Sequence, residues 1–495
     1  MSSKGLSSSP SIPSMRRSKS ESTINSISKL FPLDRTSFIK GPTPSSRKKA
    51  IVSIAIRKGL FVFVSVHGVV SSALIALALV KGKGRVKGPR GTVSKTFKSI
   101  ISDILKSSNT ARLAAWLGLY SYLWTISSAF LRRRPQWFPG WQPFIAGALS
   151  GLSLFAQTKE DRREIAPNVF CRGLYSLLMY RPLFPFPNGD IVLFALANAQ
   201  VAYGFLSHPS TLPAWYVGWI SRVGEMNPRF VRLNRHLLQH RVPISSDIKK
   251  LHHRLFVQDA QPRTWLNELK LQAWLTDPDR LNRRSAPCSL NHPQFDSCLG
   301  YNLNQLIRTV ITMSPTYAIL HLVPSLIFRS KVLLKNPLQF FLSIMKKTVY
   351  SSLFLSSFVS IVQNCFCIPT QIYDRFQITL ASSRWYSLLG ALTGICLFWE
   401  EPKRRGELAL YCAPKALYSS WASLKSAGIV KSLPFGDVLV GCLGSGMLMH
   451  CFVNGPEKMP ALARGMISQV VDPHTPERRK KTIVENVDHV DGLEN

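Results

Sequence analysis

The stretch Gly147-Ala-Leu-Ser-Gly-Leu-Ser-Leu-Phe155 recurs as Gly390-Ala-Leu-Thr-Gly-Ile-Cys-Leu-Phe398, with six identical positions and three conservative exchanges. Paired arginines follow each phrase, and then Arg172-Gly-Leu-Tyr-Ser176 matches Lys415-Ala-Leu-Tyr-Ser419. A proline and a Gly-Asp pair come next, with the Gly-Asp pair 42 residues after the start of the first phrase and 46 after the start of the second. Similarity of this length indicates an internal duplication.

The composition excludes several classes of protein. The 495-residue chain has a net charge of +36, yet 46 per cent of its residues are apolar. Basic residues therefore accompany long apolar runs, which a soluble nucleic-acid-binding protein rarely shows, and we expect no nucleic-acid partner. The nine cysteines form an odd, scattered set, which argues against a disulfide framework.

Apolar runs recur in the same order in each half. About 20 such residues cross a bilayer, and the runs are 59–80, 111–130, 143–156 and 189–206, then 306–328, 350–367, 386–399 and 438–453. Two further segments, 168–180 and 408–421, are typical of helices lying at the membrane interface. We therefore predict an all-α integral membrane protein, a duplicated four-helix unit with about eight membrane segments and two interfacial helices.

The domain boundaries follow from these runs. We expect a disordered, basic, Ser-rich tail at 1–50, a first membrane repeat at 51–220, a polar and partly helical insert with a Cys/His loop at 221–300, a second membrane repeat at 301–465, and a polar C-terminal tail at 466–495. The first tail has no apolar core of a signal peptide, and its five prolines interrupt the helix of a mitochondrial presequence, the alternative interpretation.

The sequence also bears on the helix of the insert and on the orientation of the two repeats. In the insert, one helical face would carry Trp265, Leu266, Leu269, Ala273 and Trp274. An even number of spans in each repeat gives the two copies the same membrane orientation. If the interfacial helices cross the membrane, the copies are inverted instead.

The repeated phrases carry small residues at helical spacing. Gly147 and Gly151 share one helix face, as do Gly390 and Gly394, and the missing side chains allow another backbone to approach closely in lipid. We predict a packing seam between the two halves, or a contact with a protein partner or a second copy of the chain. Gly441, Gly444 and Gly446 are candidates for the facing surface.

Ionisable residues inside apolar runs are costly and suggest a pathway or a partner. Arg308, His321 and His450 are the candidates for a pathway between the repeats. Lys346 and Lys347 are interpreted as markers of a span boundary. Asp190 and Asp437 stand where helices begin, so we interpret them as helix caps.

One loop has residue types that bind metals. Cys288-x3-His292-x5-Cys298 lacks an obvious fourth ligand, for which His252 and His253 or His236 and His240 are candidates. A tetrahedral zinc site needs four positioned donors. The sequence therefore favours an ordinary structured loop, and we expect no catalytic, cofactor-binding or metal-ligating residue and no cofactor.

Two stretches resemble a known family. The second phrase with Phe398-Trp-Glu-Glu-Pro-Lys-Arg-Arg-Gly-Glu-Leu-Ala-Leu-Tyr411, and Cys288-x3-His292-Pro293-x3-Ser297-Cys298-Leu299, look like the transmembrane protein 135 family. Its shorter relative is a four-span peroxisomal membrane protein, and both are similar to the translocase channel proteins of the mitochondrial inner membrane. The resemblance covers about residues 50 to 465, although Gln294 stands where the family's cysteine-rich stretch has tryptophan.

This resemblance implies a multi-span protein of peroxisomal or mitochondrial membranes, linked to organelle dynamics and lipid handling, without established catalytic residues. We therefore expect a non-enzymatic membrane protein in membrane homeostasis, and the alternative is a transporter or channel with a path between the repeats. Basic loops favour anionic lipid headgroups, since each nearby Lys or Arg contributes about 1 kcal/mol.

Overall fold

The computed structural model describes residues 44–80, 85–88, 91–94, 107–134, 136–180, 188–239, 264–276, 284–328 and 330–471, together with His253. The chain divides into two compact units, Met1–Ser53 and Ile54–Asn495. Every contact discussed below lies within the second unit. The tail predicted at 1–50 lies outside the described residues up to position 43, and Pro44 begins a helix.

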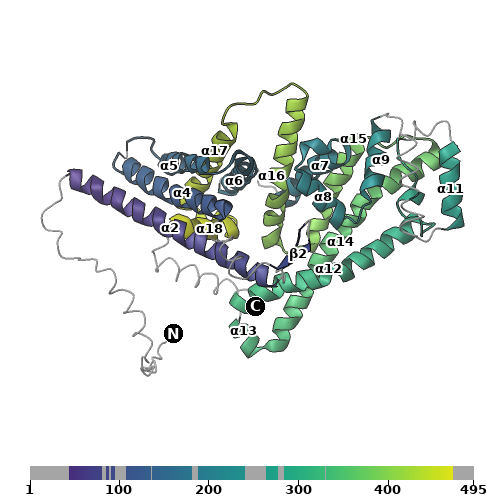
Figure 1. Ribbon diagram of the computed structural model, residues 1–495, viewed down its shortest axis with the longest axis horizontal. Helices are drawn as coiled ribbons and strands as arrows, with labels where there is room; N and C mark the ends of the chain where they lie inside the picture. Colours follow the sequence, from purple (N-terminus) through teal and green to yellow (C-terminus); the bar gives the residue numbers. More distant parts are fainter. Residues whose placement is uncertain are drawn as a thin grey trace, which may run out of the picture. The chain divides into compact units, whose positions relative to one another are not determined.

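The described part of the first half is helical except for one short hairpin (Figure 1). It comprises α2 (Pro44–Val80), β1 (Arg85–Gly88), β2 (Gly91–Ser94), α4 (Ser108–Arg132), α5 (Gln142–Gly151), the 3-10 helix η1 (Leu152–Ala156), α6 (Lys159–Tyr180), α7 (Gly189–Ser207), η2 (Pro209–Thr211), α8 (Ala214–Val223) and α9 (Pro228–Leu238). Strands β1 and β2 pair antiparallel, with Arg85 opposite Ser94.

The rest of the described chain begins with α11 and η4 of the insert, and from α12 onward its long helices follow an order similar to that of the first half. It comprises α11 (Trp265–Thr276), η4 (Cys288–Leu290), α12 (Cys298–Phe328), α13 (Ser330–Lys335), α14 (Pro337–Phe376), α15 (Ser383–Leu392), η5 (Thr393–Trp399), α16 (Pro402–Ser426), α17 (Gly436–Asn454), η6 (Pro456–Lys458) and α18 (Ala461–Val471). The predicted all-helical class is confirmed, apart from the two four-residue strands.

Five described helices are long and apolar enough to cross a membrane, fewer than the eight expected. They are Lys49–Leu74 within α2, α7, Cys298–Val323 within α12, α14 and α17. Helix α4 has the length but falls short in hydropathy, and α5 with η1 forms a shorter apolar unit. Lys346 and Lys347, the predicted markers of a span boundary, lie inside α14, which runs through them without a break.

Helices of each half pack against a helix of the other half (Figure 1). Helices α5 and α6 of the first half pack on α17, the last long helix of the second half. Helices α15 and α16 of the second half pack in turn on α7. Each phrase therefore packs on the Gly-Asp helix of the other half, and separating the halves would expose both surfaces.

The similarity between the halves also includes turns that the sequence comparison missed. After α7 the chain passes through η2, which begins at Pro209, and enters α8 after Pro213; after α17 it passes through η6, which begins at Pro456, and enters α18 after Pro460. A proline at the first helical position has no N–H to leave unpaired, so it is well suited to begin η2 and η6.

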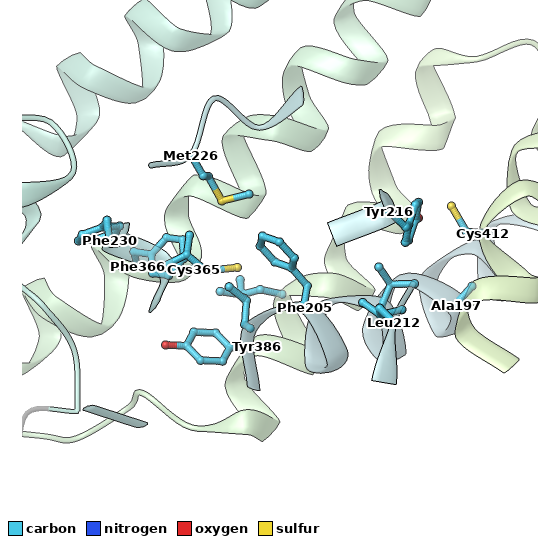
Figure 2. Packing of buried hydrophobic residues seen from close by; sticks show 14 of the residues in the cluster. Ala197, Phe205, Leu212, Tyr216, Met226, Phe230, Cys365, Phe366, Tyr386 and Cys412 are labelled. Atoms are coloured by element: carbon cyan, nitrogen blue, oxygen red, sulfur yellow. The ribbon is translucent and has the colours of Figure 1, made fainter. Parts of the chain in front are cut away.

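The largest group of buried apolar side chains joins α7, α9, α14, α15 and α16. Phe205 of α7, Cys365 and Phe366 of α14, and Tyr386 of α15 lie within it (Figure 2). Phe230 of α9 packs edge-on against Phe366, with ring centroids 5.1 Å apart. This core ties the insert to the second half, at the same end of α14 that carries Cys367.

Candidate functional site

Four metal-binding side chains meet beside the core. Cys288, His292, Cys298 and Cys367 each present one donor atom, and the four donors all lie within 4.8 Å of one another. Nε2 of His292 is 3.4 Å from Sγ of Cys298 and 3.8 Å from Sγ of Cys367. His292 and Cys367 are 2 and 1 per cent exposed, respectively, so the cluster is largely closed to solvent.

The local fold sets the orientation of the His292 ring. Its Nδ1 is 3.0 Å from the carbonyl oxygen of Phe295, which can only accept a hydrogen bond. The proton is therefore on Nδ1, and the lone pair of Nε2 faces the sulfur atoms. The Tyr301 ring stacks on a face of the His292 ring, with centroids 4.6 Å apart.

Helix α11 supports this loop from the insert. The side-chain amide of Asn267 donates to the carbonyl oxygens of Pro293 and Phe295 at 3.0 and 2.9 Å. The buried face of α11 consists of Asn267, Leu271 and Trp274. The helix lies where its apolar pattern predicted it, but the predicted face is wrong, because Trp265, Leu266 and Leu269 are exposed.

Other hydrogen bonds attach the loop to α14. The hydroxyl of Thr370 donates to the carbonyl of Ala286 at 3.2 Å, and the amide of Asn291 donates to the side-chain oxygen of Gln363 at 3.2 Å. The backbone N–H of Ala286 donates to Asn234 of α9 at 2.9 Å. The loop is thus held on both sides of Cys367.

Sequence reasoning missed Cys367. It expected no metal-ligating residue, and it considered only histidines as the fourth donor. His240 and His252 lie outside the described residues, and neither His236 nor His253 belongs to the cluster. The available signal was Cys365-Phe-Cys367 within an apolar run, but buried cysteines are common in such runs.

The glycines of the repeated phrases lie at matched contacts between the halves. A Cβ built on Gly151 would lie 2.6 Å from Cα of Cys442 in α17, and one on Gly394 would lie 2.8 Å from Cβ of Ala195 in α7. Likewise Gly147 faces the carbonyl oxygen of Ser445. Alanine or any larger residue would force these helices apart.

The equivalent contact in the second half is between Gly390 and the carbonyl oxygen of Asn198, which a built Cβ would meet. The three predicted facing glycines of α17 also lie at tight contacts, Gly441 with Leu154, Gly444 with Phe170 and Gly446 with Phe144. The glycine faces are therefore covered within the chain, and a partner would have to use another surface.

The three residues proposed for a pathway have different neighbours. Arg308 lies 3.7 Å from Glu225 and is more than half exposed. His450 stacks with Trp141 and meets Tyr180 edge-on. His321, 13 residues beyond Arg308, is about 20 Å further along α12.

His321 belongs to a separate polar cluster at the start of α16. Nη1 of Arg404 donates to Oε2 of Glu400 at 3.0 Å and to the Ser351 hydroxyl at 3.0 Å, and lies 3.3 Å from Nε2 of His321. Glu400 is only 4 per cent exposed. Lys347 and Glu401 form a neighbouring ion pair at 3.2 Å. A buried carboxylate of this kind depends on its cation.

The two aspartates lie within the first helical turns and not at the N-cap positions, which are Asn188 and Phe435. Both cap residues have left-handed backbone conformations. The Asp190 carboxylate accepts the N–H of Ile191 at 2.9 Å, whereas Asp437 pairs with Arg162 at 3.2 Å. Asp190 thus caps a free backbone N–H as predicted, whereas the capping role predicted for Asp437 is corrected to an ion pair with Arg162; the helix dipole favours both first-turn acids.

One cation of α16 is partly withdrawn from water. The Lys415 ammonium lies over the rings of Tyr411 and Trp215, 5.2 and 5.8 Å from their centroids. Burial lowers the pKa of Lys415, and Glu164, the strongest opposing influence, raises it. Trp215 donates to that same carboxylate at 2.9 Å, so these groups connect α6, α8 and α16.

No family model, curated protein or solved structure matches the chain.

Proposed function

We propose that this is an integral membrane protein, and the exposed apolar surface of its long helices carries the proposal. The apolar window of α12 is almost entirely unburied, and Ile307, Ile311, Ile319 and Leu320 on it are all more than half exposed. Helix α2 presents similar side chains, including Leu60, Val64 and Val69. Contiguous apolar surface of this extent is unfavourable in water, and lipid chains would cover it.

Within the membrane we propose two copies of one unit, each contributing four segments. The five apolar helices would be joined by α4, by α5 with η1, and by α15 with η5 as shorter or less apolar segments. Their support is the matched contacts of Gly151 with Cys442 and of Gly394 with Ala195. Shielded segments need less apolar surface because other helices cover them.

For its role, we propose a non-enzymatic factor in the homeostasis of a peroxisomal or mitochondrial membrane, in lipid handling or organelle dynamics. The support is the resemblance of residues 50 to 465 to the transmembrane protein 135 family. The net charge of +36 adds an affinity for anionic headgroups.

A transporter is the second candidate, and the polar cluster around His321 favours it. Glu400, Arg404 and His321 meet beside α12 and α14, both of spanning length. Ionisable groups at such places line many substrate paths. Because Arg308 and His450 lie elsewhere, a path would involve His321 with Arg404. The test is a transport assay in reconstituted vesicles. Transport by the unmodified protein that is lost in a folded Arg404→Ala variant would favour this candidate over the first.

Membrane insertion is tested on the full-length protein with a C-terminal tag. Organelle fractions are extracted with alkaline carbonate, with a soluble matrix protein as the control. We expect the tagged chain to stay in the pellet, and its release with the control would contradict integral insertion. Co-fractionation with peroxisomal or mitochondrial markers then decides between the two membranes, and residence in any other membrane would contradict the proposed role.

A further inference from the structure

We propose that Cys288, His292, Cys298 and Cys367 bind one zinc ion in a closed structural site. The inference does not depend on the membrane role, since it concerns the attachment of the insert to the α12–α14 pair. Three thiolates and one imidazole form a common ligand set for structural zinc. No other group of metal-binding side chains of this kind occurs in the described part of the chain.

The donor separations fit a tetrahedral ion. With zinc–sulfur and zinc–nitrogen bonds of about 2.3 and 2.0 Å, neighbouring donors lie roughly 3.5 to 3.8 Å apart. Nε2 of His292 lies 3.4 and 3.8 Å from the sulfur atoms of Cys298 and Cys367. All four donors lie within 4.8 Å of one another, so binding requires side-chain adjustments of about an ångström.

The surroundings prepare the site for a cation. The Phe295 carbonyl fixes the proton of His292 on Nδ1, which leaves Nε2 as a ligand, and Asn267 holds that carbonyl in place. Such outer contacts set the tautomer and the orientation of ligating histidines in metal sites. A buried histidine with a purely structural role would not require three thiols around its Nε2 atom.

The chemistry of the donors favours zinc, and the closed geometry favours a structural role. Thiolates select soft or borderline metals over magnesium and calcium. Four protein donors fill a tetrahedral shell and leave no position for a substrate or an activated water. The burial of His292 and Cys367 fits this conclusion.

The ligands come from three places in the chain. Cys288 and His292 belong to the loop around η4, Cys298 is the first residue of α12, and Cys367 lies well inside α14. Zinc would therefore join the insert to both helices of the long pair. Because metal binding is coupled to folding in such sites, its loss would loosen the insert.

The test uses full-length protein purified in detergent, with metal measured by inductively coupled plasma mass spectrometry. We expect about one zinc per chain in the unmodified protein. Cys367→Ser should lower the zinc content at least tenfold. The matched control is Cys365→Ser, two residues away in the same helix and equally buried. Its sulfur faces the Ile361 carbonyl, a partner that a serine hydroxyl can also use.

Two measurements on the unmodified protein cover the case in which Cys367→Ser does not fold. A mercurial reagent that blocks thiolates should release the zinc, and cobalt in its place should give thiolate charge-transfer and tetrahedral d–d absorption. Chains without bound metal after dialysis against zinc, a disulfide among the three cysteines, or equal zinc in Cys367→Ser and Cys365→Ser would each overturn the proposal.

Discussion

The two halves of the chain have the same glycine contacts but different polar groups at equivalent positions. Gly151 against α17 has its counterpart in Gly394 against α7. The residue after each 3-10 helix is extended and buried in both halves, but it is Gln157 in the first and Glu400 in the second. Gln157 donates to the Arg112 carbonyl at 3.0 Å, whereas Glu400 accepts from Arg404.

This difference teaches what each kind of contact tolerates. A glycine against a backbone has no smaller replacement, so both halves keep it. A buried polar side chain needs only some partner, so a neutral amide and an ion pair serve equally at that position. The three predictions below test this contrast, from the largest expected effect to the smallest.

The largest effect is expected from Gly151→Leu combined with Gly394→Leu. Each leucine would collide with the facing helix, where even a Cβ lies 2.6 or 2.8 Å from its neighbour. We expect destabilisation by more than about 3 kcal/mol, seen as loss of the monodisperse peak in size-exclusion chromatography in detergent. The control is Gly68→Leu on α2, whose added Cβ meets nothing within 4 Å. A monodisperse double variant would mean that the helices of the two halves do not pack on one another as described.

A smaller effect is expected from Arg404→Ala, which leaves the Glu400 carboxylate buried without its cation. The side chain of Arg404 is 38 per cent exposed, so we expect about 2 kcal/mol, below the range for fully buried pairs. The measurement is the thermal unfolding midpoint followed by tryptophan fluorescence. Adding Glu400→Gln should restore most of the lost stability, because position 400 would then carry a neutral amide, as position 157 does in the first half.

The matched control for Arg404→Ala is Asp161→Ala in the first half. Asp161 accepts from the Thr158 hydroxyl at 2.6 Å near the start of α6, and no buried charge depends on it. We expect a loss of roughly 0.5 kcal/mol, the scale of a helix-capping contact. Equal losses for the two variants would remove the distinction between the halves at this position.

The smallest effect is expected at the first turns of α7 and α17. Asp437→Asn breaks the Arg162 pair, whose side chains are 14 and 19 per cent exposed, and should cost about 1 kcal/mol. Asp190→Asn removes only the negative charge near the helix N-terminus, because the asparagine amide oxygen can still accept the N–H of Ile191, and should cost roughly 0.3 kcal/mol. Thermal unfolding at low and high salt separates them, because salt should weaken the Asp437 effect. A reversed order would indicate another partner for Asp190.

The sequence predicted much of the fold because its signals are local. Apolar runs located the long helices, and the phrases around Gly147 and Gly390 located the glycines that pack between the halves. Helix ends were less accurate: α14 continues through Lys346 and Lys347, since lysine side chains do not end a helix. In α11 the position of the helix was predictable, but the buried face was not, because Asn267 is buried by bonds to a loop that the pattern does not reveal.

The sequence by itself determined that the chain is helical, that stretches of it repeat, and that Cys288, His292 and Cys298 lie within eleven residues of one another. Only the tertiary structure decided which helix each glycine faces and that Cys367 joins the three loop residues. The physical reason is the same in both cases. A glycine in the sequence indicates that another group can approach closely, and a cysteine indicates that a thiol is present. The partner of each residue depends on packing between segments far apart in the chain.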